Sequence, residues 1–381
     1  MPTHRTADLS ALPPRLDSLT GLRWFAAFAV FLHHAGNFGS TDMAPVLRFG
    51  TYGVTFFFVL SGFVLTWSSR PEVGTTTFYW NRVSRIYPAT FVAFLLALPV
   101  FYSFNPDPSQ WWVKPVDVGI LLLSIPLIQA WWNAPTILFS GNPAAWTLTC
   151  EFFFYALHPL FIRPMRRMRA RASLWALAAL VAAYLAFGLA VAQWPGSWLA
   201  QIPQPVAQLP TFVMGMLLAA AMRGGWQFRI HPAVTYVATG AFIVFLVVTA
   251  GNPNWFAIKF AETAPQWIAV LCALMIAAVA TRDVLQRPSA LRRKFWVRLG
   301  EWSFCFYLLH AHFVYTARAI WGQQPTGWLN LVWWALLLAV SIAAAAALHH
   351  FVEKPAERAM RQWWKRRAEA RRVPVLAAEA E

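Results

Sequence analysis

Residues 329–352 read LNLVWWALLLAVSIAAAAALHHFV and contain no Lys, Arg, Asp or Glu. A helix needs about 20 mostly apolar residues to cross the hydrocarbon core of a bilayer, so this stretch is long enough to do so. Nine further apolar runs occupy residues 22–38, 49–67, 87–104, 146–162, 174–193, 208–222, 233–250, 265–281 and 303–320. We therefore expect an all-α integral membrane protein with about ten transmembrane helices.

The composition of the 381-residue chain supports this class. Apolar residues make up 59% of the chain and charged residues only 12%, whereas a soluble domain carries about 25% charge. These values exclude a soluble enzyme and a disordered chain. The net charge of +16 fits basic cytoplasmic loops facing anionic lipid better than a nucleic-acid partner. We expect a multi-pass protein of the cell membrane (plasma or inner membrane), with lipids and no nucleic acid as partners.

One apolar stretch, residues 118–133, contains Pro126 and is ambiguous as a span. Ten crossings without it place 27 of the 31 Lys and Arg residues on the cytoplasmic side, and counting it as a crossing places 23 there. We therefore predict a re-entrant or interfacial segment and two cytoplasmic termini. Residues 1–352 then form one transmembrane domain. Residues 353–381 form a basic cytoplasmic tail, predicted to be an amphipathic helix on the lipid surface with Trp363 and Trp364 at headgroup depth.

Ionisable groups at membrane depth are costly and therefore indicate function. Arg23 and His34 are 11 residues apart, so they share one helix face, about 16 Å apart along the axis. Glu151 has a similar predicted depth to His34, and a carboxylate beside an imidazole would make it a better base. Tyr155 lies one turn beyond Glu151 on the same face. Two structural alternatives remain, in which His34 bonds a nearby carbonyl and a protonated Glu151 merely bonds across helices.

Arg82 and Arg85 lie three residues apart in a predicted cytoplasmic loop. On a helical turn they would point the same way, and a guanidinium pair matches the geometry of phosphate. Arg23 faces the same compartment, so a phosphorylated donor could meet all three, although contact with lipid phosphates is the alternative. His310 could touch the same donor or only pack. Ser61 belongs to a Ser-Gly pair that could instead serve close helix packing.

Six motifs in order resemble those of the acyltransferase-3 family of multi-pass membrane O-acyltransferases. They are SLTGLRWFAAFAVFLHHAG (18–36), GVTFFFVLSGFVL (53–65), NRVSRIYP (81–88), AWTLTCEFFFYALHPL (145–160), WSFCFYLLH (302–310) and FVEKPAERAM (351–360). Thr147 stands where the family usually has Ser. The stretch around Glu151 looks like that of stand-alone members that acylate macrolide antibiotics. We expect no attached hydrolase-like domain of the kind that some relatives carry.

The resemblance implies an enzyme that moves an acyl group, often acetyl, from cytoplasmic acyl-CoA to a hydroxyl of a carbohydrate or natural product. It implies that His34 is the general base, that Glu151 is its partner, and that Arg23, Arg82 and Arg85 bind the CoA phosphates. We also assign Ser61 and His310 to acyl-CoA binding. Acyl-CoA is a co-substrate, and no metal or cofactor is expected.

The chemistry expected is direct transfer, in which His34 removes the hydroxyl proton while the alcohol attacks the thioester. Tyr155 is a candidate to stabilise the oxyanion. A covalent route through Cys150 is the alternative, although this residue lies about 100° from Glu151 around the helix. Buried His and Glu side chains also suit a proton-coupled small-molecule transporter, which is the rival class of function.

Overall fold

The computed structural model describes residues 15–378, with side chains described through residue 370, and this part of the chain is almost entirely helical. The exception is a pair of two-residue parallel strands, β1 (Tyr102–Ser103) and β2 (Lys114–Pro115), in which Tyr102 pairs with Lys114. The expectation of an all-α chain is confirmed.

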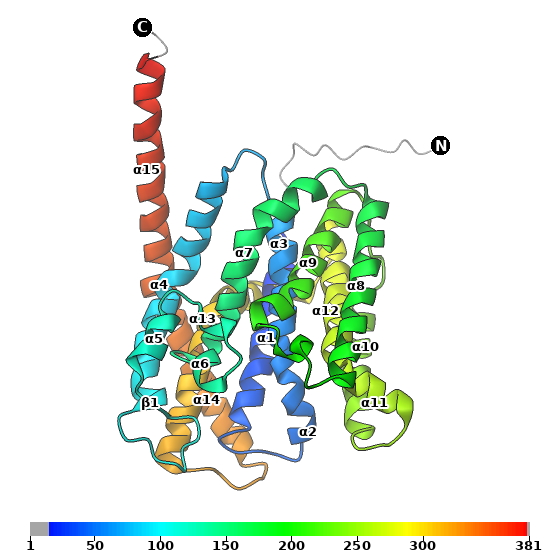
Figure 1. Cartoon of the computed structure of the whole chain (residues 1–381), viewed down its shortest axis with the longest axis vertical. Helices are drawn as coiled ribbons and strands as arrows, with labels where there is room; N and C mark the ends of the chain where they lie inside the picture. Colours follow the sequence, from blue (N-terminus) through cyan, green and yellow to red (C-terminus); the bar gives the residue numbers. More distant parts are fainter. Residues whose placement is uncertain (1–14, 379–381) are drawn as a thin grey trace.

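Each of the ten predicted apolar runs overlaps one helix (Figure 1). In chain order these helices are α1 (Asp17–Ala35), α3 (Gly53–Trp67), α4 (Thr75–Phe101), α7 (Trp146–Met165), α8 (Ala170–Gln193), α9 (Gln204–Arg223), α10 (Pro232–Val248), α12 (Ala264–Val284), α13 (Lys294–Trp321) and α14 (Asn330–Leu348). A π-helical turn, η6 (His349–Glu353), joins α14 to α15 (Lys354–Ala378).

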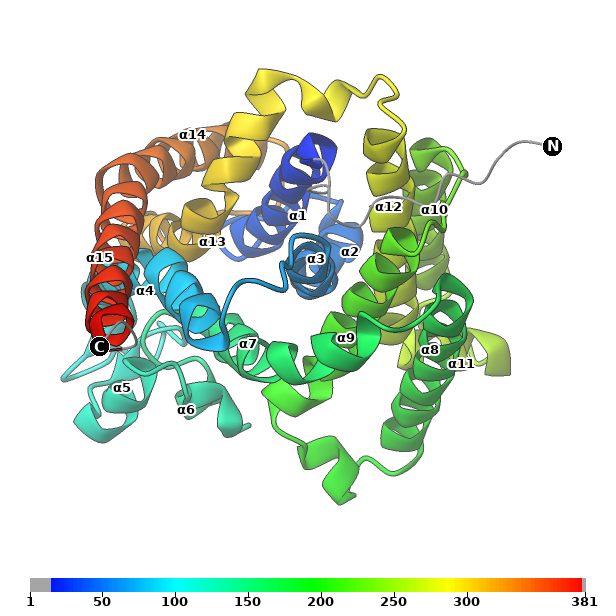
Figure 2. The same ribbon diagram turned by 90° about the horizontal axis from the view of Figure 1, so that it is seen from above.

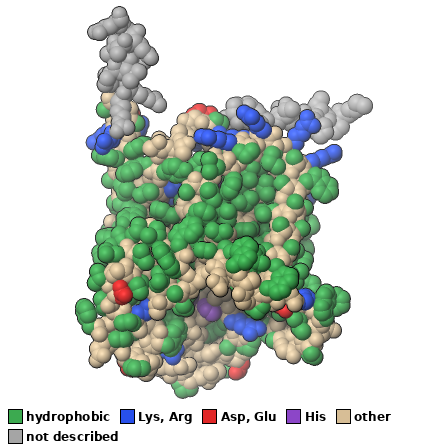
Figure 3. All heavy atoms as spheres, viewed as in Figure 1, with side chains coloured by type: hydrophobic (Ala, Val, Ile, Leu, Met, Phe, Trp, Pro, Cys, Tyr) green, Lys and Arg blue, Asp and Glu red, His purple; other side chains and the backbone are tan. Residues whose placement is uncertain are grey.

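Six helical segments of the described chain are long and apolar enough to cross a membrane, namely Ala44–Trp67, Thr75–Phe101, Ala170–Gln193, Gln204–Arg223, Ala264–Val284 and Asn330–Ala370. Figure 3 shows a broad band of apolar side chains, with Lys and Arg gathered mainly toward the upper and lower ends. The protein is therefore a multi-pass membrane protein, while ten crossings and their orientation stay a prediction.

Short elements fill the connections. The segment 118–133 contains no continuous helix, because α5 (Val118–Ser124) ends just before Pro126, and Leu127 adopts a positive φ of 58°. The remaining short helices are α2 (Ala44–Leu47), η1 (Arg48–Tyr52), η2 (Gln129–Trp131), α6 (Pro135–Leu138), η3 (Pro143–Ala145), η4 (Trp198–Gln201), α11 (Trp255–Glu262) and η5 (Ala290–Arg292). In Figure 1, α5 and α6 lie in the lower half beside α7.

Glycines set the packing of the central helices. Seen from above, α1 and α3 lie in the middle of the molecule (Figure 2). A Cβ on Gly62 of α3 would collide with the backbone oxygen of Phe212 in α9, and one on Gly300 of α13 would collide with that of Thr20 in α1. Small residues at such crossings let helix backbones approach closely. The close-packing role proposed for the Ser61–Gly62 pair therefore holds for Gly62.

Two local expectations need correction. The stretch around Arg82 and Arg85, predicted as a loop, belongs to the first turns of α4. The tail is helical as predicted, but α15 continues upright past the upper end of the bundle (Figure 1). The rings of Trp363 and Trp364 both contact the ring of Trp80 on α4, while Trp363 remains exposed, and the headgroup depth of the two indoles stays a prediction.

Candidate active site

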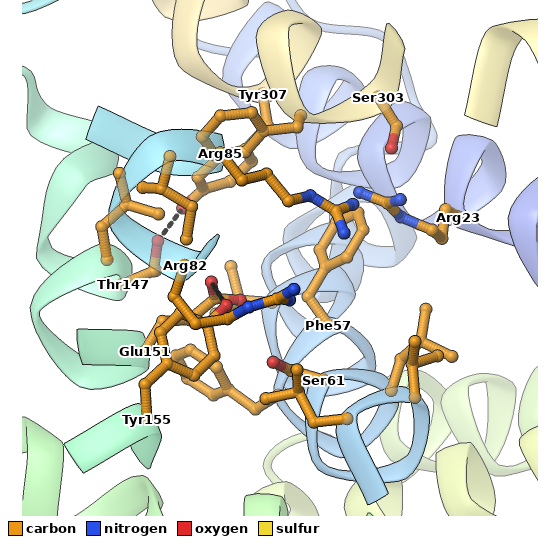
Figure 4. Close-up of a pocket in the computed structure, with 18 residues that line it drawn as sticks. Arg23, Phe57, Ser61, Arg82, Arg85, Thr147, Glu151, Tyr155, Ser303 and Tyr307 are labelled. Atoms are coloured by element: carbon orange, nitrogen blue, oxygen red, sulfur yellow. Dashed lines mark hydrogen bonds between the residues drawn. The ribbon is translucent and has the colours of Figure 1, made fainter. Parts of the chain in front are cut away.

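A buried cavity opens between five helices, α1, α3, α4, α7 and α13 (Figure 4). Its polar lining comes from side chains far apart in the sequence: Arg23, Ser61, Arg82, Arg85, Thr147, Glu151, Tyr155, Ser303 and Tyr307. Six of the eight predicted site residues thus line one cavity, and His34 and His310 do not.

Three guanidinium groups point into this cavity (Figure 4). Arg23 comes from the second turn of α1, while Arg82 and Arg85 come from adjacent turns of α4. In the described part of the chain, no carboxylate lies within 4 Å of any of them, and the buried Nε of Arg82 has no hydrogen-bond partner. Glu151 is the one carboxylate among the lining residues. Three partly buried cations without a paired carboxylate make the cavity suited to an anionic ligand.

Glu151 is held by its own helix. The hydroxyl of Tyr155 donates a hydrogen bond of 2.6 Å to Oε2 of Glu151, one turn away on α7. This is the same-face relation expected from the spacing. Tyr155 therefore belongs to the arginine cavity, and its hydroxyl is engaged with Glu151.

His34 has different partners from those predicted. Its Nδ1 lies 2.9 Å from the carbonyl oxygen of Val30 and 3.3 Å from Nε2 of His310 on α13. Among the described residues, neither hydrogen bonds nor ion pairs join His34 to Glu151. The predicted direct His34–Glu151 pair is therefore wrong, because depth along the helix axes agreed but another helix supplies the neighbour. The carbonyl contact that was weighed as an alternative is present.

A thin layer separates His34 from the arginine cavity. Val30, Val54, Ala144 and Tyr307 pack together there. The hydroxyl groups of Thr147 and Tyr307 lie 3.2 Å apart, and both donate to the carbonyl oxygen of Ala144. Tyr307 lines the cavity on one side, and its ring centroid lies 5.9 Å from that of His310 on the other. His34 itself is partly exposed.

A second chamber extends the arginine cavity toward the upper end of the bundle. The two share Arg23, Leu60, Val64 and Arg85, and the second chamber adds residues at the start of α1 and the end of α3. These added residues are Arg15, Leu16, Leu19, Thr20, Trp67, Ser68 and Arg70. Five arginines, Arg15, Arg23, Arg70, Arg82 and Arg85, therefore line the two adjoining chambers, and Glu151 lies in the first.

Two features were missed or left open by the sequence. Cys150 is fully buried and does not line the cavity.

Behind α13, Cys305 and His349 both bond Oε2 of Glu353, at 3.1 and 2.8 Å. The sulfur, the nitrogen and the carboxylate oxygen lie within 4.8 Å of one another, so the three side chains could hold a metal ion. In this structure they are hydrogen-bonded to one another instead. The signals available in the sequence were Cys305, in the run before His310, and Glu353 in the closing FVEKP motif, 48 residues later.

Comparisons with known proteins agree with the sequence motifs. A family model described as an acyltransferase domain matches residues 16–350. Acyltransferase MdmB of Streptomyces mycarofaciens is 34% identical, and the match covers 96% of each chain. Nodulation protein 10 of Rhizobium leguminosarum bv. viciae is 28% identical over 88% of this chain and 91% of its own.

Peptidoglycan O-acetyltransferase OatA of Listeria monocytogenes is 24% identical over 89% of this chain but only 55% of its own length. No solved structure matches. The family match and the MdmB match together confirm the resemblance stated from the motifs and favour an enzyme over a transporter. The chain belongs to the acyltransferase-3 family and is a membrane-bound acyltransferase.

Proposed function

We propose that this enzyme takes an acetyl group from acetyl-CoA and transfers it to a hydroxyl of a sugar or macrolide-like acceptor. The observation that carries the proposal is the arginine cavity, in which three partly buried arginine side chains and a single carboxylate line one space. Such a surplus of positive charge is suited to the phosphates of a CoA thioester.

The donor would enter from the upper end of the bundle, which we assign to the cytoplasm because both ends of the described chain lie there (Figure 1) and both termini are predicted to be cytoplasmic. Its nucleotide end would occupy the second chamber, and its phosphates would meet Arg23, Arg82 and Arg85. Glu151, bonded to Tyr155, would balance part of the cavity's charge and help to orient these guanidinium groups. This replaces its expected role as the partner of His34.

From the arginines the pantetheine arm would pass Tyr307 to bring the thioester near His34. Arg23 and His34 lie about 16 Å apart along α1, a distance that suits an extended arm. The hydroxyl groups of Thr147 and Tyr307 meet at this layer, so they would have to separate for the pantetheine arm to pass.

The acceptor would approach His34 from the opposite side. His34 is partly exposed and does not line the arginine cavity, and Figure 3 shows a hollow in the lower half of the molecule. The hydroxyl proton goes to His34, the alcohol oxygen forms the new bond to the acyl carbon, and the C–S bond breaks. The thiolate leaves easily, because a thiol has a pKa of only about 8.5, and it can take up the proton from His34.

The acceptor class is drawn from the relatives. One is named for O-acetylation of peptidoglycan, and the stretch around Glu151 looks like that of stand-alone members that acylate macrolides. A hydroxyl of a macrolide or its sugar is our first choice, because the MdmB match covers both chains almost completely. The plasma membrane is the proposed location.

The test incubates membranes with labelled acetyl-CoA and two acceptors, a macrolide with free sugar hydroxyls and a peptidoglycan fragment, and identifies the labelled product. We expect transfer by the wild type and none by His34→Ala. His350→Ala is the matched control, because His350 is exposed and lies outside both chambers. Near-normal transfer by a folded His34→Ala protein would refute the base assignment, and no labelled product from either acceptor would refute the acceptor classes.

A further inference from the structure

Two histidines from different helices meet edge to face inside the bundle. The rings of His34 on α1 and His310 on α13 have centroids 5.0 Å apart at an interplanar angle of 70°. Nε2 of His310 points at Nδ1 of His34 across 3.3 Å. His310 is fully buried and lies outside the arginine cavity, so the donor-binding role predicted for it has no support in this arrangement.

The neighbouring carbonyls fix the protons on both rings. Nδ1 of His34 lies 2.9 Å from the Val30 oxygen, and Nδ1 of His310 lies 2.8 Å from the Tyr307 oxygen. A carbonyl oxygen only accepts hydrogen bonds, so each Nδ1 must carry the hydrogen. In two neutral rings each Nε2 then keeps its lone pair. The single Nδ1–H of His34 is then shared between the Val30 oxygen at 2.9 Å and the lone pair on Nε2 of His310 at 3.3 Å, and Nε2 of His34 is left free to take a proton.

The surroundings of His310 hold its ring in this orientation. Its Nδ1 also lies 3.2 Å from the carbonyl oxygen of Phe306, and the Phe306 ring is nearly parallel to it at 5.8 Å. Rotation of the imidazole would break the contact with the Tyr307 oxygen and leave a polar nitrogen buried without a partner, which is costly. His310 is thus a rigid acceptor placed behind His34.

We propose that His310 is a positioning residue for His34. Together with the Val30 oxygen, it holds the imidazole of His34 in the form whose Nε2 can accept the hydroxyl proton. It also stabilises the imidazolium that follows, because the Nδ1–H of a charged ring donates a stronger hydrogen bond to the His310 lone pair. The proton itself stays on Nε2 of His34 until the departing thiolate takes it. This inference rests on the proposed role of His34 as the base.

The test compares substitutions that keep or remove an acceptor at the position of Nε2. The side-chain amide of Gln reaches about as far as Nε2 of His, whereas that of Asn ends near the position of Nδ1. We expect His310→Phe and His310→Asn to lower kcat by about ten- to hundredfold, which is the range for one hydrogen bond to a charged group. His310→Gln should recover most of kcat. KM for acetyl-CoA should stay unchanged in all three, because His310 lies outside the donor cavity.

His312→Phe is the matched control. His312 is buried on the same helix, but its Nε2 bonds the carbonyl oxygen of Ala93 and does not contact His34. Its kcat should stay close to that of the wild type when the melting temperatures of the variants are comparable. Equal rates for the Gln and Asn variants would overturn the proposal even if His310→Phe does not fold. An active His34→Ala protein would instead refute the base assignment, whatever the His310 variants do.

Discussion

Replacing Arg85 with Gln tests whether the arginine cavity binds the phosphates of the donor. Arg85 lies at the junction of the two chambers, and its guanidinium group faces that of Arg23 (Figure 4). Gln keeps a polar side chain of similar reach but removes the charge and the planar fork that matches phosphate. The variant is measured with two donors, acetyl-CoA and S-acetylpantetheine, which has the same thioester but no phosphate.

The expected size of the effect follows from the partners of Arg85. Because no carboxylate in the described chain lies within 4 Å of it, its guanidinium group is free to pair with the ligand. A hydrogen-bonded contact with a charged group contributes about 1.5–3 kcal/mol, which corresponds to a fall of about ten- to hundredfold in kcat/KM for acetyl-CoA. With S-acetylpantetheine the wild type and the variant should differ little, since the contact is missing in both.

The assay follows label transfer to the acceptor in detergent or membranes and reports kcat/KM for the four combinations of enzyme and donor. Arg48→Gln is the control, because Arg48 is exposed in η1 at the other end of the molecule. It should behave as the wild type with both donors. If Arg85→Gln lowered kcat/KM equally with both donors, Arg85 would support catalysis without binding phosphate, and its assignment to the donor phosphates would be refuted.

Three further outcomes are expected. Gly62→Ala should lower the free energy of unfolding by about 1–3 kcal/mol, measured by melting in detergent, because the added Cβ has no room against α9. Gly240→Ala is the control and should leave the melting temperature unchanged, because no atom lies within 4 Å of the added Cβ. Similar melting temperatures for the two variants would contradict this prediction. Cys150→Ala should retain acyl transfer, since Cys150 is buried outside the cavity, and loss of activity in a folded variant would revive the covalent route. Trp364→Ala should speed tryptic cleavage of α15 by removing the stack on Trp80, and an unchanged rate would show that other contacts hold the helix.

Part of the candidate site could be predicted from single helices. The three-residue spacing of Arg82 and Arg85 predicted that both point the same way, and both line the cavity. The four-residue spacing of Glu151 and Tyr155 predicted one face, and their side chains bond. These relations follow from the geometry of one helix, which is fixed by its repeat.

Relations between helices were harder to predict. The predicted depths of His34 and Glu151 made a pair plausible, yet His310 is the residue that meets His34. Rise per residue gives the position along an axis and says nothing about which helix is adjacent or how it is rotated. The same limit applies to Glu353, whose bonds to Cys305 and His349 join α13 to the turn before α15.

The sequence by itself determined that this is a helical membrane protein, where its apolar helices lie and to which family it belongs, because bilayer thickness demands long apolar runs and family motifs are read directly from residue order. Only the tertiary structure decided that three arginines from α1 and α4 share a cavity with Glu151, and that His34 pairs with His310 behind a layer formed around Tyr307. The physical reason is that helix neighbours are chosen by packing, such as the close crossings at Gly62 and Gly300, and packing is a property of the assembled bundle.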